Sequence, residues 1–185
     1  MKELLRDKSR DKLAYALNSL GVKAEMVERG QVEEQVENSW YQRSLGVIDI
    51  HGGSIRWVNI LKKDRQKHSP PRWWVVLGIP VDGPVSTRQQ AKIKTVREKS
   101  FPLFGKIVDV IWRGDDDGTG LVDTLSRDIP TKTLAKRIGN LEIKSQTDRF
   151  QGWTLTVDRR FTPTGQDWET VEKIAYYILS SPRYS

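Results

Sequence analysis

The sequence predicts an α+β domain, with an antiparallel or mixed sheet built from hairpins and helices packed mainly on one face. Three observations support this fold class. Two pairs of strand-like runs are joined by short turns, amphipathic helical patterns lie near both ends of the chain, and no regular strand–helix–strand alternation occurs. A chain of 185 residues can bury enough surface for one core, so we expect a single domain over residues 1–185.

The strands are predicted from runs rich in valine, isoleucine and aromatic residues. Residues 45–50 and 55–61 flank a Gly-Gly turn, an arrangement that is typical of a β-hairpin. Residues 141–145 and 153–157 are predicted to form a second hairpin. Further strands are expected at residues 22–28, 73–80 and 104–112.

Helices are predicted where apolar residues recur at every third or fourth position. Such a stripe ends at Leu20, and Gly21 after it is a typical helix stop. A final amphipathic helix is expected over residues 167–179. Other helices are expected at residues 121–125, after Pro130, and from Thr87 to Lys99, where Thr87 and Gln90 resemble a capping box. Residues 33–42 fit either a loop or a short helix.

Two segments share one apolar pattern. Residues 13–23 match residues 134–144 without a gap, and both patterns describe a helix that leads into a strand. A true duplication would give two similar α-plus-hairpin halves on one sheet. Any amphipathic helix that leads into a strand produces the same pattern, so both interpretations stay open.

The composition excludes several kinds of site. The absence of cysteine excludes disulfides, thiolate nucleophiles and cysteine-based zinc or iron–sulfur sites. Two histidines are too few for a histidine-rich metal site, and we expect no cofactor. No apolar run is long enough to cross a membrane, and charges interrupt the N-terminal segment where a signal peptide would be apolar. We therefore expect a cytoplasmic protein without a membrane partner.

The positive charge of the chain is concentrated in its middle. The net charge is +7, and residues 56–106 contain 12 of the 31 basic residues but only 3 of the 24 acidic ones. The remainder of the chain is slightly acidic. Clustered charge, more than total charge, creates a field that attracts a polyanion.

This basic block also contains aromatic residues. Cations that neutralise phosphates, beside rings that stack on bases, are what non-specific nucleic-acid binding requires. Because successive side chains of a strand point to opposite faces, one of Trp73 and Trp74 is expected to face the core. The candidate nucleic-acid-binding residues are Lys62, Lys63, Arg65, Lys67, Arg72, Trp73, Arg88, Lys92 and Lys99.

Residues 115–119 read DDDGT and resemble the D-x-D-G-T motif of haloacid-dehalogenase-type phosphatases. That resemblance implies Asp115 as the phosphoryl acceptor and Asp117 as the general acid. In the family the motif follows a buried strand directly, whereas Arg113 and Gly114 intervene here. The alternation of ligands that a calcium loop needs is also missing. We therefore predict an acidic turn that is neither catalytic nor a specific metal site.

Another set of polar residues resembles the minimal core of PD-(D/E)xK nucleases. The set comprises Glu25, Asp49, Asn59 and Lys62, and it implies a metal ion held by acids with a lysine that orients water. Asn59 stands where that family has an acid. Lys62 lies three residues beyond Asn59, so it is expected on the opposite face of a regular strand. His51 beside Asp49 has no nucleophile that the sequence places near it.

Charge and aromatic placement therefore favour a non-enzymatic binding domain. We expect it to engage nucleic acid or another polyanion through the central basic loop and helix. The first alternative is a protein-interaction adaptor or chaperone-like module that uses an exposed aromatic strand or the acidic segment 31–37. The second alternative is a metal-dependent nuclease.

Overall fold

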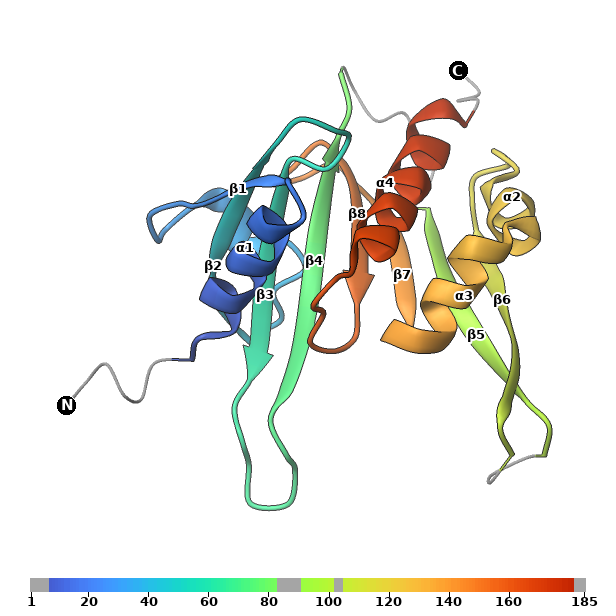
Figure 1. Ribbon diagram of the computed structural model, residues 1–185, viewed down its shortest axis with the longest axis horizontal. Helices are drawn as coiled ribbons and strands as arrows, with labels where there is room; N and C mark the ends of the chain where they lie inside the picture. The colour runs from blue at the N-terminus through green and yellow to red at the C-terminus, as the bar shows by residue number, and fades with distance from the viewer. Residues whose placement is uncertain (1–6, 83–90, 102–104, 182–185) are drawn as a thin grey trace.

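Strand pairing dominates the structure, a computed structural model that describes residues 7–82, 91–101 and 105–181. The strands are β1 (Lys23–Met26), β2 (Arg43–His51), β3 (Trp57–Lys63), β4 (Arg72–Pro80), β5 (Lys92–Lys99), β6 (Ile107–Asp115), β7 (Leu141–Gln146) and β8 (Gly152–Val157). They form one sheet in the order β1-β2-β3-β4-β8-β7-β5-β6 (Figure 1). Every pairing among these strands is antiparallel.

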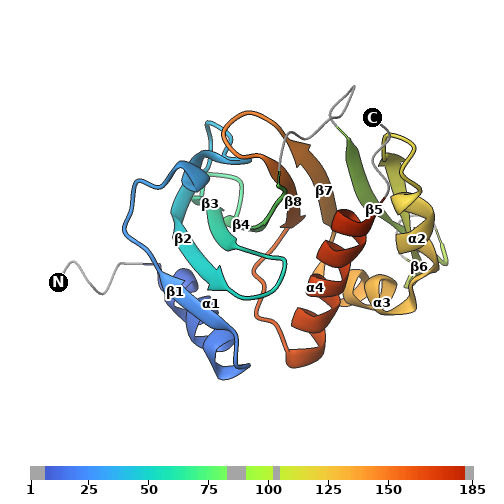
Figure 2. The same cartoon turned by 90° about the horizontal axis from the view of Figure 1, so that it is seen from above.

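The α-helices of the described chain cover one face of this sheet. They are α1 (Ser9–Ser19), α2 (Leu121–Arg127), α3 (Ile129–Ile138) and α4 (Gly165–Ser180). Helix α1 lies over β1 and β2, and the other three lie over the half of the sheet that contains β5 to β8 (Figure 2). The predicted α+β class is therefore confirmed. None of these helices has the length and apolar character needed to span a bilayer.

The prediction of a basic helix from Thr87 to Lys99 is wrong, because residues 92–99 form strand β5. Ile93 and Thr95 are buried and alternate with the exposed Lys92 and Lys94, which is the period of a strand. The β-branched residues of this segment favour a strand. The charged lysines between them resemble the exposed side of an amphipathic helix, so the sequence pattern is interpreted as helical. Thr87 and Gln90, the expected capping box, lie outside the described residues.

The two halves of the chain contribute equal parts of the sheet but are connected differently. Strands β1 to β4 follow one another as a meander, whereas the second half has the order β8-β7-β5-β6. The matching segments are α1 with β1 and α3 with β7. Helix α1 packs on its own strand at the edge of the sheet, while α3 packs on β6 and α4. The shared pattern therefore describes similar local units in different surroundings.

The main core lies between the sheet and the helices, and α4 covers the middle of this core. Helix α4 buries the stripe that its sequence predicts, namely Trp168, Val171, Ile174, Ala175 and Ile178. Thr164 and Asp167 cap its first turn reciprocally. Asp128 then ties α3 to α4, because it accepts bonds from the backbone N–H of Thr131, from Tyr177 and from Lys173.

A smaller core lies on the opposite face of the sheet. The segment between β1 and β2, with the short 3-10 helix η2 (Val32–Gln35), covers part of that face. Val36 of this segment packs there with residues of the strands, namely Val47, Trp57, Leu61 and Val76. The indole of Trp57 lies flat against Gly78 of the neighbouring strand, where any side chain would collide with the ring. This half of the sheet is therefore buried on both faces.

A buried arginine joins α1 to the strands below it. The guanidinium of Arg10 donates to the carbonyl oxygens of Val27 and Val47. Gly46, at an irregularity in the β2–β3 pairing, has φ +109° and leaves the space that the guanidinium fills. These bonds position the covering segment and the helix relative to the same strand.

Side chains cap the backbone groups of both outer strands. At one edge, the amide of Asn18 donates to the carbonyl oxygen of Ala24 at 2.8 Å and accepts from its N–H at 3.3 Å. At the other edge, Ser126 accepts from the N–H of Trp112 and Lys136 donates to the carbonyl oxygen of Val108. Neither edge strand therefore presents a regular row of unpaired groups over these residues.

Glu172 of α4 connects the helix layer to the turn between β2 and β3. Its carboxylate accepts the backbone N–H of Ser54 at 2.8 Å and lies against Gly53. Burial raises the pKa of Glu172 above its ordinary value, although the bonds from the turn and the charge of Arg56 act in the other direction. Burial of this carboxyl therefore favours its neutral form more than water does.

We expect Trp168→Ala to lower the free energy of unfolding by about 3–5 kcal/mol, because it removes a large buried ring beneath α4. Trp40→Ala is the matched control, since 95% of Trp40 is exposed. Urea unfolding of both variants measures the difference. A midpoint for Trp168→Ala equal to that of the control would contradict the packing described for α4.

We expect Glu172→Gln to become more stable relative to the wild type as the pH rises. The pKa of Glu172 is raised on folding, so ionisation costs the folded state nothing below the unfolded pKa and a growing amount above it. The cost is complete once the pH exceeds the folded pKa. Thermal unfolding between about pH 4 and 8 measures this trend, with exposed Glu169→Gln as the control. A stability difference that does not change with pH would refute it.

Candidate functional site

A difference in strand length creates a recess at one end of the sheet. Strand β8 pairs with β4 only from Val75 onward, so Arg72 to Trp74 extend past the end of β8. Strand β5 pairs with β7 only over Lys92–Lys94, so its remaining residues extend past the start of β7. Both projections lie at the same end of the molecule (Figure 1).

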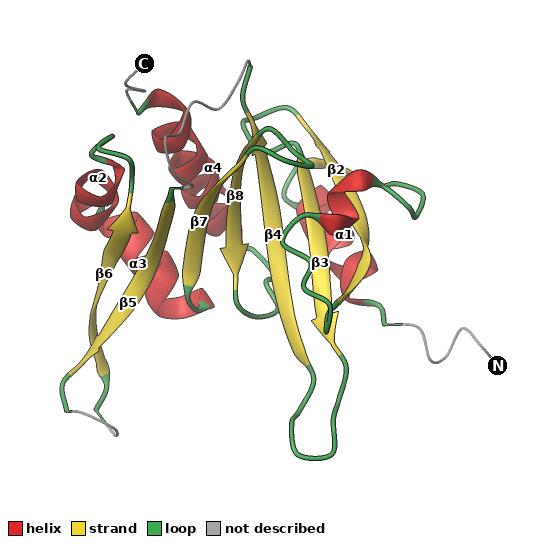
Figure 3. Cartoon of the chain, turned by 180° about the vertical axis from the view of Figure 1, so that it is seen from behind, coloured by secondary structure: helices red, strands yellow, loops and turns green. Residues whose placement is uncertain are grey.

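The recess between the two projecting hairpins is a cleft of about 480 Å³. Three strand spacings separate β4 from β5 in the sheet order, which corresponds to about 14 Å. Trp74 lines one wall, Lys94 and Arg97 line the other, and Asn140, Thr156 and Asp158 form the floor. No helix stands in front of this part of the sheet in Figure 3, where β4, β8, β7 and β5 face the viewer.

Most of the predicted binding residues meet at this end of the sheet. Lys62, Lys63 and Arg72 occupy paired positions at the ends of β3 and β4. Arg65 and Lys67 are exposed in the loop between those strands. Lys99 lies at the end of β5, on the other side of the cleft. Lys63 and Arg97 at this end are half-buried, and its other unpaired cations are exposed. We call this set of cations the basic edge; its members are Lys63, Arg65, Lys67, Arg72, Lys94, Arg97 and Lys99.

Three predicted cations do not belong to the basic edge. Lys62 is largely buried and forms an ion pair with Asp7 at 2.7 Å, so its charge is neutralised within the fold. Lys92 lies at the far end of β5 and pairs with Glu142 at 3.2 Å. Arg88 lies outside the described residues.

The tandem tryptophans point to opposite faces of β4, as the sequence predicts. Trp73 packs against the main core, and the guanidinium of Arg160 lies 3.7 Å from the centre of its ring. Trp74 packs against the smaller core, with the guanidinium of Arg72 at 5.3 Å. Both indoles are therefore partly covered, each by an arginine, and neither offers a free face comparable to an exposed ring.

Exposed aromatic rings do lie beside the basic edge, but at positions that were not predicted. Trp40 is 95% exposed and Tyr41 42% exposed, and their rings meet edge to face at 5.6 Å. The ammonium group of Lys63 lies 5.4 Å from the ring centre of Tyr41. On the other hairpin, Phe101 is 66% exposed two residues beyond Lys99. An aromatic side chain thus stands at each side of the cleft.

The cleft is lined by two cations, Lys94 and Arg97, and by two carboxylates, Glu142 and Asp158. Burial and the nearby charge of Arg159 lower the pKa of the Arg97 guanidinium, with Asp158 acting in the opposite direction. Arg97 donates to the carbonyl oxygen of Ala135 at 2.8 Å, so its guanidinium reaches α3 on the helix side of the sheet. Asp158 meanwhile accepts two bonds from Asn140, which shape the floor. An incoming anion would relieve the repulsion between the two arginines.

The acidic turn after β6 is organised by bonds within the turn. Asp115 accepts the N–H of Asp117 at 2.9 Å. Asp116 accepts the N–H groups of Gly118 and Val122, both at 3.1 Å, so it caps the start of α2. These local bonds provide a structural role for the carboxylates.

The nuclease-like set is not assembled into one site. Glu25 and Asp49 are cross-strand partners, but Asn59 is fully buried and bonds to Ser44 and to the backbone of η2. Lys62 points to the helix side of the sheet, toward Asp7 and away from these groups. Across the described residues, no cluster of three or more histidine or carboxylate side chains is placed to hold a metal ion.

The acidic segment 31–37 is attached to the sheet by its own carboxylates. Glu34 accepts two bonds from Arg29 and one from the N–H of Gly30, and the bond with Arg29 lowers its pKa despite burial. Glu37 reaches Lys144 of β7 at 2.6 Å. These two glutamates are therefore engaged within the fold, which leaves less acidic surface for a protein partner than the sequence suggests.

Comparison with known proteins adds no relative: no protein-family model, curated protein or solved structure matches the chain. A function for this molecule therefore has to follow from the chemistry of its own surface.

Proposed function

We propose that the protein binds single-stranded nucleic acid across the basic edge. The observation that carries this proposal is the exposed pair Trp40 and Tyr41, which stands beside Lys63 at the base of a lysine-rich and arginine-rich hairpin loop. Phosphates would contact the cations of the two hairpins, and bases would stack on the exposed rings. No reaction is required of the site, and the binding is independent of a metal ion.

The placement of the cations supports a polymeric ligand. The basic edge continues from the β3–β4 loop through the cleft to the end of β5, and the cleft itself is about 480 Å³. A chain of phosphates can engage both hairpins at once, whereas a single small anion can reach only one of them. Each neutralised phosphate releases condensed counterions, which makes such binding strongly dependent on salt.

The exposed rings favour a single strand over a duplex. A base can stack on Trp40 or Phe101 only when it is not stacked inside a double helix. Stacking accepts every base, so we expect little sequence preference. The partial covering of Trp73 and Trp74 by arginines makes those two rings less suitable as platforms.

We expect Lys63→Ala, Arg65→Ala and Lys67→Ala together to flatten the salt dependence of binding to an oligothymidylate. Three lost phosphate contacts correspond to about two units in the log–log slope on single strands. Lys62 is left intact because of its ion pair with Asp7. Fluorescence anisotropy at several salt concentrations measures the slope.

The matched control removes three exposed cations away from the basic edge, namely Lys23, Arg56 and Arg127. This variant has the same net charge as the test variant, so a purely global effect of charge would flatten both slopes equally. Equal slopes would contradict a localised site. If the wild-type protein binds neither the oligonucleotide nor heparin at low salt, the proposal is wrong and a protein partner is favoured.

We expect Trp40→Ala to weaken binding to single strands by about 1–3 kcal/mol, or about 5-fold to 150-fold, without loss of stability. Trp40→Phe should retain most of the affinity, because phenylalanine still offers a ring. Tyr15→Ala removes another exposed ring from α1 and serves as the control. An affinity of Trp40→Ala equal to that of the wild type would show that the exposed indole is not a stacking platform.

A further inference from the structure

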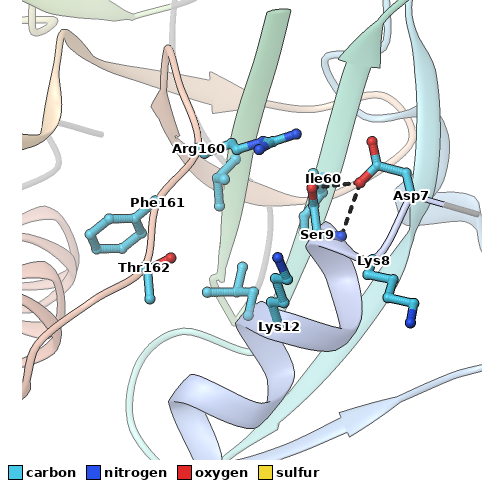
Figure 4. A pocket seen from close by; sticks show the side chains of 10 residues that line it. Asp7, Lys8, Ser9, Lys12, Ile60, Arg160, Phe161 and Thr162 are labelled. Atoms are coloured by element: carbon cyan, nitrogen blue, oxygen red, sulfur yellow. Dashed lines mark hydrogen bonds between the residues drawn. The ribbon is translucent and has the colours of Figure 1, made fainter.

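A second cleft, of about 380 Å³, lies on the helix side of the sheet. Helix α1 forms one wall and the segment 160–162, after β8, forms the other. Strands β3 and β4 form the bottom through Ile60 and Val75 (Figure 4). The sheet separates this cleft from the aromatic pair of the proposed nucleic-acid surface.

The one carboxylate that lines this cleft is already fully engaged. Asp7 accepts the N–H and the hydroxyl of Ser9 at 2.9 and 2.6 Å, and it pairs with Lys62 at 2.7 Å. Burial alone would raise the pKa of Asp7, but these partners outweigh it and hold the pKa well below its usual range. The carboxylate is therefore charged and neutralised, and it also occupies the start of α1.

Two cations at the opening have no such partner. Among the described residues, no acidic group lies within ion-pair distance of Lys12 or Arg160. Figure 4 shows the Lys12 ammonium rising from α1 and Arg160 lying across the opening from it. Stacking on Trp73 at 3.7 Å holds Arg160 in place and leaves its N–H edge free to donate.

The deeper part of the cleft is apolar. Besides Ile60 and Val75, it is formed by Leu13 and Phe161, all of which are almost completely buried. A polar ligand edge placed there would lose its bonds to water without replacement. A hydrocarbon or unsubstituted aryl group has no hydrogen bonds to water to lose. The cleft therefore disfavours a nucleobase and favours an apolar group.

We propose that this cleft binds a small amphipathic anion, with an aliphatic or aryl body against Ile60 and Val75 and a carboxylate or phosphate head between Lys12 and Arg160. Its volume lies within the range of small-molecule sites. The site depends on both parts of the ligand, because the floor supplies no hydrogen bonds and the rim supplies little apolar surface. It is independent of the nucleic-acid surface proposed above.

Isothermal titration with four probes tests this inference: decanoate, phenyl phosphate, inorganic phosphate and decanol. We expect saturable binding of decanoate or phenyl phosphate, and the tighter of the two identifies the head group and body. Inorganic phosphate and decanol should each bind about 10-fold more weakly or not at all. Equal binding of inorganic phosphate, or no saturable binding of any probe, overturns the proposal.

Variants then locate the bound probe. Thr162 is exposed at the mouth, so Thr162→Trp should fill the opening and abolish binding while the core stays intact. Lys12→Ala with Arg160→Ala should weaken binding about 10-fold or more. Lys67→Ala, on the basic edge, is the control and should change nothing. Unchanged binding by Thr162→Trp, checked for native folding by circular dichroism, overturns the assignment.

The same variants separate this inference from the proposed function. Thr162→Trp should bind oligothymidylate as the wild type does, while the triple variant at Lys63, Arg65 and Lys67 should bind the amphipathic probe as the wild type does. Displacement of the bound probe by an oligonucleotide would show that the two sites are one, and would overturn the independent small-molecule site.

Discussion

The short central strands β7 and β8 are the constraint on which the rest of the arrangement depends. They have six residues each, whereas β4 has nine and β5 has eight. Because their pairing partners are longer, the two flanking hairpins must project beyond them on the same side. The concave end of the molecule is therefore a product of backbone register. Lys63, Arg72, Lys94 and Lys99 lie on paired strands, whereas Arg65, Lys67 and the exposed rings lie in the adjoining loops and turns.

Because side chains alternate along β4, arginine–tryptophan stacks lie on both faces of the sheet. Trp73 and Trp74 point in opposite directions; Arg160, from the segment after β8, covers Trp73, and Arg72 of the same strand covers Trp74. The Trp73–Arg160 stack faces the helices and borders the second cleft, beside α1. Trp74 borders the cleft between β4 and β5 on the other face of the sheet. The two proposed binding sites thus lie on opposite sides of the sheet, near one pair of adjacent residues.

Much of the fold could be predicted because hairpins and amphipathic helices leave local patterns. The Gly-Gly turn and the stripe of α4 are examples, and both are found where the sequence places them. Strand β5 was missed because its outward lysines resemble a basic helix surface, and its pairing with β7 depends on residues about fifty positions away. The predicted cations of the β3–β4 hairpin were found together because they are neighbours in sequence. The isolation of Lys92, the ion pair of Lys62 and the position of Trp40 depend on tertiary register, which no local pattern contains.

The capped outer strands have a consequence for behaviour at high local concentration. A polymer that binds many copies side by side raises their effective concentration greatly, and open strand edges would then join neighbouring copies into continuous sheets. Asn18 occupies the backbone groups of Ala24 at one edge, and Ser126 and Lys136 occupy groups of β6 at the other. If the proposed function holds, copies crowded along one nucleic-acid strand would therefore not join through these capped edges, and each copy could dissociate individually.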